Sequence, residues 1–208
     1  MFGQNALHAL MSTLANHSRI VVVGTSCCGK TTFCRKLATV LGRQHIELDA
    51  LHWGANWTPN PDFLSRVEAA VADDDWIVDG NYTKARAATW SRATALVWLN
   101  FGFPLVFWRS LRRTCCRIAT REKLYSGNQE SVVHSFLHWD GIPWWILRTF
   151  HSRRRELRTL FQEPEFAHLQ LFEFHHPAQA EALLVGGAEQ WKQKRWEQKG
   201  VKIAKMQE

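Results

Sequence analysis

A phosphate-binding motif between two apolar runs is the feature that most constrains the fold. Residues 24–31 match the pattern G-x-x-x-x-G-K-[ST]. The preceding run 20–23, Ile-Val-Val-Val, is typical of a buried strand, and residues 33–41 have the apolar spacing of a helix. A strand, a glycine-containing loop and a helix in this order predict an α/β fold with a parallel sheet.

The residue types of this loop predict a site for the phosphates of a nucleoside triphosphate. Gly24 and Gly29 allow the backbone to curl, so that its N–H groups point at phosphate oxygens, and the helix that follows adds the positive end of its dipole. Lys30 can reach the β- and γ-phosphates, and the Thr31 hydroxyl can bind Mg²⁺. The predicted nucleotide-binding residues are Gly24, Thr25, Ser26, Cys27, Cys28, Gly29, Lys30, Thr31 and Thr32.

The rest of the chain repeats the alternation of strands and helices. Strands are predicted at residues 19–23, 44–48, 76–78, 95–99 and 169–174, and helices at 33–41, 63–71, 105–119, 143–161 and 178–185. This order predicts one α/β domain with helices on both faces of a parallel sheet. We expect an N-terminal arm at 1–18, the domain at 19–187 with a basic helical insertion at about 105–161, and a polar tail at 188–208.

Two aspartates follow predicted strands and therefore fall at the edge of the sheet where parallel α/β folds bind ligands. Asp79 ends the strand 76–78, where a carboxylate can hold Mg²⁺ near Thr31; the alternative is a turn-forming Asp before Gly80. Asp49 ends the strand 44–48, on the same face as Glu47, and could orient or deprotonate an acceptor hydroxyl.

Polar and aromatic residues near these strand ends are candidates for binding a phosphoryl acceptor. Arg86 could hold an anionic group through its two-pronged donors, whereas His52 could instead only pack its loop. The predicted acceptor-binding residues are Asp49, His52, Trp53, Asn81, Tyr82 and Arg86.

The positive charge of the chain is concentrated in one segment. The net charge is +7, and residues 109–158 contain eleven basic and four acidic residues. Arg109, Arg113 and Arg117 recur every four residues and share one helix face, as a lid that neutralises a transferring phosphoryl group requires. The same row is also consistent with a solvated helix face, and the whole segment with a nucleic-acid footprint. The predicted catalytic residues are Lys30, Asp49, Arg113 and Arg117.

The five cysteines predict neither a disulfide framework nor a zinc site, because their number is odd and no C-x-x-C spacing occurs. Reduced thiols fit a cytosolic protein. The sequence contains no run of eighteen apolar residues, so it predicts no membrane-spanning helix. Cys27 and Cys28 lie beside Lys30 near a helix N-terminus, which predicts a lowered thiol pKa and sensitivity to oxidation. The alternative, which we prefer, is that they are small residues that fit the loop.

Several segments taken together resemble a known family. The phosphate loop, His45–Trp53, Trp76–Tyr82, Leu96–Leu99 and Thr120–Glu130 are similar to the adenylate-kinase-related P-loop ATPases, many of which are labelled topology modulation protein. The resemblance covers residues 19–185. It implies a P-loop NTPase fold like that of nucleoside-monophosphate and shikimate kinases, with a five-stranded parallel sheet ordered 2-3-1-4-5. It also implies that Asp79 and Gly80 lie near magnesium, and that Arg86 is placed to bind an acceptor.

These features lead to two functional hypotheses. The first is a Mg²⁺-dependent kinase that transfers the γ-phosphoryl group of ATP to a nucleoside monophosphate or another small metabolite. ATP is preferred over GTP because no N/TKxD-type guanine-reading element occurs. The second is a nucleotide-switched ATPase that binds nucleic acid through residues 109–158. The sequence does not indicate a membrane partner.

Overall fold

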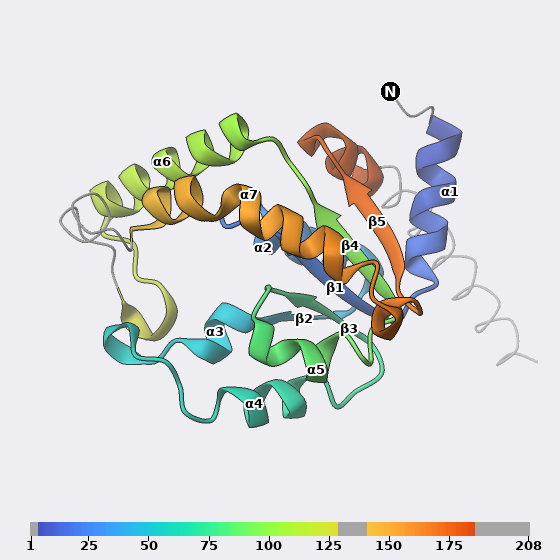
Figure 1. Ribbon diagram of the computed structural model, residues 1–208, viewed down its shortest axis with the longest axis horizontal. Coiled ribbons are helices and arrows are strands. Elements are labelled where there is room, and N and C mark those ends of the chain that lie inside the picture. The colour runs from blue at the N-terminus through green and yellow to red at the C-terminus, as the bar shows by residue number, and fades with distance from the viewer. Residues whose placement is uncertain (1–3, 129–140, 186–208) are drawn as a thin grey trace, which may run out of the picture.

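The computed structural model describes residues 4–128 and 141–185 (Figure 1). The strands are β1 (Arg19–Gly24), β2 (Gln44–Glu47), β3 (Trp76–Asp79), β4 (Ala95–Leu99) and β5 (Gln170–Phe174). The α-helices are α1 (Gln4–Ala15), α2 (Lys30–Leu41), α3 (Leu48–His52), α4 (Phe63–Ala70), α5 (Arg86–Thr89), α6 (Phe103–Thr120) and α7 (Ile142–Leu160), and residues 177–185 are also helical. Short 3₁₀ turns are η1 (Ala55–Trp57), η2 (Thr83–Ala85), η3 (Tyr125–Gly127) and η5 (Pro164–Phe166).

The strands form one parallel sheet in the order β2-β3-β1-β4-β5. This confirms the predicted fold class and strand order. β1 is central and its side chains alternate: Ile20 and Val22 lie in one core cluster, and Val21 and Val23 in the other. Both faces of β1 are therefore buried, which explains why it is an uninterrupted apolar run.

Helices cover the two faces of the sheet and form two cores. The first core holds α1, α2, the helix 177–185 and the N-terminal half of α7, whereas the second holds α4 and the C-terminal end of α7. The long helix α7 contributes to both, with Ile146 and Phe150 in the first and Leu157 in the second. Figure 1 shows α6 and α7 side by side on one side of the molecule, with α3, α4 and α5 on the other.

Most element boundaries lie close to their predicted positions, with a few informative differences. β2 ends at Glu47, so Asp49 lies in the first turn of α3 instead of at the end of a strand. The segment predicted as an arm contains α1, whose Met11 and Leu14 are buried in the first core. The predicted tail 188–208 and the middle of the basic insertion, residues 129–140, lie outside the described residues. No helix in the described part of the chain is long and apolar enough to span a membrane.

Candidate active site

The phosphate loop connects β1 to α2 in the conformation that its glycines permit. Gly24 has φ +154°, and a Cβ there would lie 2.7 Å from Cys28 Sγ and 2.8 Å from the Leu99 carbonyl oxygen. Gly29, with φ +107°, precedes the first residue of α2. Position 24 therefore excludes a side chain by contact as well as by φ. The unpaired N–H groups at the start of α2 are a ready anion-binding group.

Lys30 lies directly over this loop. Its Nζ donates to the carbonyl oxygens of Gly24 at 3.1 Å and Thr25 at 3.3 Å. Burial opposes the charge of this ammonium, but its interactions with Cys28, Asp79 and Asp49 outweigh burial and raise the pKa of Lys30. The side chain is therefore a cation placed at the loop, as phosphate binding requires.

Three oxygen-bearing side chains meet beside Lys30. The Thr31 hydroxyl donates its single proton to Glu47 Oε1 at 3.3 Å, and its closeness to Asp79 also lowers the pKa of Asp79. Asp79 is 3% exposed, and its Oδ2 is without a hydrogen-bond partner among the described residues. Burial nevertheless dominates and raises the pKa of Asp79 to about 6. A hydroxyl and two carboxylates are the donor set that Mg²⁺ prefers, so these residues fit a magnesium ion.

Aromatic side chains surround Asp49 on the opposite side of the site. The Tyr82 hydroxyl donates to Asp49 Oδ1 at 2.6 Å, and burial together with the Asp49 carboxylate raises the pKa of Tyr82. The His52 ring lies 4.5 Å from the Tyr82 ring and 4.6 Å from the Trp53 ring, measured between centroids. Burial lowers the pKa of His52, which favours the neutral imidazole. Asp49 is thus held as a hydrogen-bond acceptor beside a neutral histidine.

A segment after α6 closes over this aromatic group. The Tyr125 hydroxyl in η3 donates a hydrogen bond to Glu47, and the Ser126 hydroxyl donates one to the Trp53 carbonyl oxygen at 2.9 Å. Asn128 Nδ2 donates to the Gly54 carbonyl at 2.8 Å, and its Oδ1 accepts from the Trp57 N–H at 3.2 Å. The stretch from Tyr125 to Asn128 is therefore fastened to the loop after α3 by side-chain hydrogen bonds.

The arginines of α6 face the phosphate loop. Arg109 Nη1 donates to the Cys28 carbonyl oxygen at 2.7 Å. Arg113 and Arg117 lie further along the same helix and line the same cavity, with Arg117 also 3.4 Å from Glu122. The three arginines of the predicted face therefore line the cavity, and their role as a lid stays a prediction.

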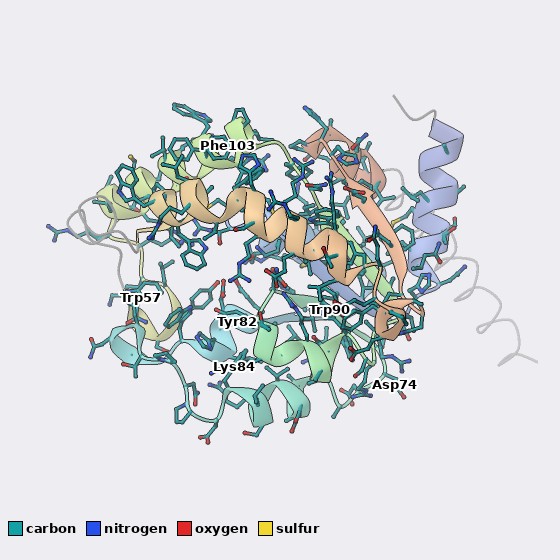
Figure 2. The ribbon with its side chains drawn as sticks, in the orientation of Figure 1. Trp57, Asp74, Tyr82, Lys84, Trp90 and Phe103 are labelled. Atoms are coloured by element: carbon teal, nitrogen blue, oxygen red, sulfur yellow. The ribbon has the colours of Figure 1, made fainter. Side chains whose placement is uncertain are left out.

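One cavity of about 1850 Å³ joins the loop, the α6 arginines and the aromatic group. It contains all nine predicted nucleotide-binding residues and, of the acceptor candidates, Asp49, His52, Trp53, Asn81 and Tyr82. Trp57 and Tyr82, labelled in Figure 2, also line it. A small-molecule pocket is typically about 300–1,000 Å³, so this cavity has room for two ligands side by side.

Arg86 is the acceptor candidate that the structure separates from the others. It is not among the described residues that line the cavity. Its guanidinium pairs with Glu156 at 2.7 Å, lies 5.5 Å from the centre of the Trp90 ring and reaches Asn81 Oδ1 at 3.5 Å. In this arrangement Arg86 fastens α5 to α7.

The expected activation of the loop thiols is wrong for Cys28. Cys28 is buried at 1% exposure, and burial raises its pKa even though Lys30 opposes the rise. The sequence places the thiol near a cation and a helix N-terminus, but only the fold shows that it points into the first core. No disulfide joins any of the five cysteines, all of which lie in the described part of the chain.

Three residues of the site were not on the lists of predicted catalytic, nucleotide-binding, acceptor-binding or metal-binding residues, although Arg109 was part of the predicted arginine row. Glu47 contacts Thr31, Arg109 contacts the loop, and Tyr125 contacts Glu47. The sequence indicated the position of two of them, because Glu47 lies at the end of a predicted strand and Arg109 begins the arginine row. Tyr125 had none, because its approach to Glu47 depends on how the insertion folds back.

Comparisons with known proteins give similarity of fold at low sequence identity. No protein-family model and no curated protein matches the sequence. Among solved structures, the chain is similar to a gluconokinase from Sinorhizobium meliloti 1021 (TM-score 0.44, 18% identity, 86% of this chain and 97% of that one). It is also similar to shikimate kinases from Bacteroides thetaiotaomicron (TM-score 0.49, 14% identity, 85% and 99%) and from Acinetobacter baumannii, the latter in complex with shikimate (TM-score 0.49, 19% identity, 83% and 92%). At these scores the likeness is one of general architecture, so the functional proposal below rests on the residues of the site.

Proposed function

We propose that this protein is a Mg²⁺-dependent kinase that transfers the γ-phosphoryl group of ATP to a small acceptor. The observation that carries the proposal is the single cavity whose two ends differ in chemistry. One end has the phosphate loop with Lys30, and the other has the Asp49–Tyr82 hydrogen bond among aromatic rings. A donor and an acceptor bound at the two ends would meet between them.

Each part of the site has a task in such a reaction. The loop N–H groups and Lys30 hold the phosphates, and Thr31, Glu47 and Asp79 hold Mg²⁺, which offsets the charge of the phosphates. Asp49 accepts a hydrogen bond from the acceptor hydroxyl and takes its proton as transfer proceeds. Arg113 and Arg117 stabilise the negative charge that spreads over the transferring group.

The test is ADP release from ATP and Mg²⁺ by the purified full-length chain, alone and with a panel of acceptors. The panel contains nucleoside monophosphates and small hydroxylated metabolites, with GTP replacing ATP in a parallel set. A large stimulation by one compound, with its phosphorylated product seen by mass spectrometry, supports a kinase and names the acceptor. Slow hydrolysis that no acceptor stimulates counts against the proposal.

The alternative, a nucleotide-switched nucleic-acid binder, is supported by a group of basic residues in the C-terminal half of α7. Arg154, Arg155 and Arg158 surround a hollow of about 260 Å³ together with His151. Arg109, Arg113 and Arg117 line the main cavity instead, which leaves fewer cations on the outside for a phosphate backbone. Nucleic-acid binding that weakens steeply with salt and changes with ATP would favour this alternative.

A further inference from the structure

A cluster of three metal-binding side chains lies beneath the phosphate loop, outside the cavity described above. It consists of Cys34 in α2, His45 in β2 and Asp79 at the end of β3. One potential ligand atom from each, a thiol sulfur, an imidazole nitrogen and a carboxylate oxygen, lies within 4.8 Å of the other two. The kinase proposal gives no role to Cys34 or His45, but it assigns Asp79 to magnesium. The carboxylate of Asp79 would therefore be shared by two ions, with its Oδ2, which lies 3.9 Å from His45 Nε2, on the side of this cluster.

The fold explains why these distant residues converge. β2 and β3 are parallel neighbours in which His45 is paired with Ile77 and Glu47 with Asp79. Side chains two apart on a strand share a face, so His45 and Asp79 point to the face on which Ile77 packs. Cys34 belongs to the same core as Ile77 and lies one turn into α2. The three side chains therefore meet between α2 and the edge of the sheet.

Two buried atoms of this cluster are left without hydrogen bonds. His45 Nε2 and Asp79 Oδ2 have no partner among the described residues, and they lie 3.9 Å apart, too far for a hydrogen bond to each other. Asp79 is 3% exposed and Cys34 is fully buried. Buried polar atoms normally have partners because an unsatisfied one costs about 1–3 kcal/mol. A metal ion placed between these two atoms and the thiol would satisfy both of them.

We propose that Cys34, His45 and Asp79 bind one transition-metal ion of the Zn²⁺ class. Sulfur and imidazole ligands favour Zn²⁺ and similar ions, whereas Mg²⁺ takes oxygen ligands. In a tetrahedral zinc site the ligand atoms are about 3.4–3.6 Å apart, so the cluster closes by roughly 1 Å to bind the ion. His45 lies on the edge strand and its side chain is 16% exposed, which gives the ion a route from solvent.

The charges around the cluster are compatible with a divalent ion. Lys30 and Arg35 act on it as cations, and the carboxylates of Glu47 and Asp79 oppose them. Binding converts the Cys34 thiol to a thiolate, with the proton released to solvent, and this adds a negative charge. The bound ion would hold α2 against β2 and β3 directly below the phosphate loop.

The test uses the full-length chain, freed of metal with a chelator and titrated with Co²⁺. The expected result is binding of one ion per chain with a sulfur-to-cobalt charge-transfer absorption band. Zn²⁺ should displace the Co²⁺, and excess Mg²⁺ should not. Absence of the band at saturating Co²⁺, or its loss on addition of Mg²⁺, overturns the proposal.

Variants identify the ligands and separate this site from the kinase site. Cys34→Ala should abolish the sulfur band, and His45→Gln should weaken Co²⁺ binding by more than about 100-fold, since even loss of a residue that supports a ligand costs 10–100-fold. Cys115→Ala, which removes an exposed thiol in α6, should leave both unchanged. If circular dichroism shows that Cys34→Ala is unfolded, His45→Gln alone decides. Unaltered binding in the folded variants overturns the assignment, and none of these readouts depends on ATP turnover.

Discussion

The two ends of the cavity are built in opposite ways. At the end proposed for the nucleotide, consecutive residues form the site: Gly24 and Gly29 shape the loop, and Lys30 bonds back to its carbonyl oxygens. At the end proposed for the acceptor, separate segments are joined by side-chain hydrogen bonds: Tyr82 donates to Asp49, and Asn128 bonds to the backbone of the loop after α3. Local backbone geometry determines the arrangement at the first end, and tertiary packing determines it at the second. Substitutions at the two ends should therefore have different consequences.

The largest effect is expected at the nucleotide end. Lys30→Ala removes the cation over the loop and should lower ATP turnover by at least about 100-fold, or roughly 3 kcal/mol of transition-state stabilisation, with or without acceptor. ADP release measures it. Arg66→Ala in α4, which removes a cation outside the cavity, is the control. Turnover retained in Lys30→Ala would contradict the role given to this loop.

At the acceptor end, Asp49→Asn should impair the reaction of the acceptor without impairing the binding of ATP. We expect acceptor-dependent turnover to fall by about 100-fold because the proton acceptor is lost, while binding of ATP is unchanged. Tyr82→Phe removes the hydrogen bond to Asp49 and should cost about 10-fold, mainly in the KM for the acceptor. Tyr125→Phe is the matched control: it contacts Glu47, so it should alter the Mg²⁺ requirement instead. Equal losses in both tyrosine variants would show that the two ends are not distinct.

Asp79, beside Lys30, should make the stability of the metal-free chain depend on pH. Its pKa is raised by burial to about 6, so the folded state favours the protonated acid and loses stability as pH rises from about 4 through 6. Asp79→Asn removes the cost of the buried charge. The free energy of unfolding of this variant, taken relative to that of wild type, should therefore be up to about 3 kcal/mol higher at pH 7 than at pH 4. Urea denaturation at the two pH values measures this, with exposed Asp73→Asn as control. The prediction fails if the difference between variant and wild type is the same at both pH values.

The smallest effect concerns Arg86, for which the sequence predicts acceptor binding and the structure shows an ion pair. If Arg86 only fastens α5 to α7, Arg86→Ala and Glu156→Ala should each cost about 1 kcal/mol of stability, with non-additive effects in the double variant. The acceptor KM should then change equally in both. A rise in KM confined to Arg86→Ala would instead support the acceptor-binding role.

The fold was largely predictable because its signals are local. The apolar run of β1, the stop of α2 at Gly42 with φ +68°, and Pro143 in the first turn of α7 are each legible in a short window of sequence. The boundary at β2 was less so, because the helix that begins at Leu48 depends on burial of that side chain in the second core. Propensity alone does not distinguish one more strand residue from the first residue of a five-residue helix.

The candidate site was predictable to different degrees. Asp49, His52 and Tyr82 could be proposed because each follows a predicted strand and parallel strand ends meet at one edge, and the three do line one cavity. Arg86 was placed with them on the same reasoning, yet its partner Glu156 lies seventy residues away and directs it elsewhere. The sequence did not indicate that Cys34 and His45 lie close together. Metal motifs are recognised by short spacings, whereas these two residues are brought together by the packing of α2 on the sheet.

By itself, the sequence determined the phosphate loop and the alternation of strands and helices, because a positive φ, a buried apolar run and a helix N-terminus are properties of a few adjacent residues. The tertiary structure decided which side chains complete the site. Arg109 reaches the loop, Tyr125 covers Glu47, and Cys34, His45 and Asp79 converge because packing and strand register bring distant residues together. Such contacts depend on the position of the whole chain in space, and no local pattern records them.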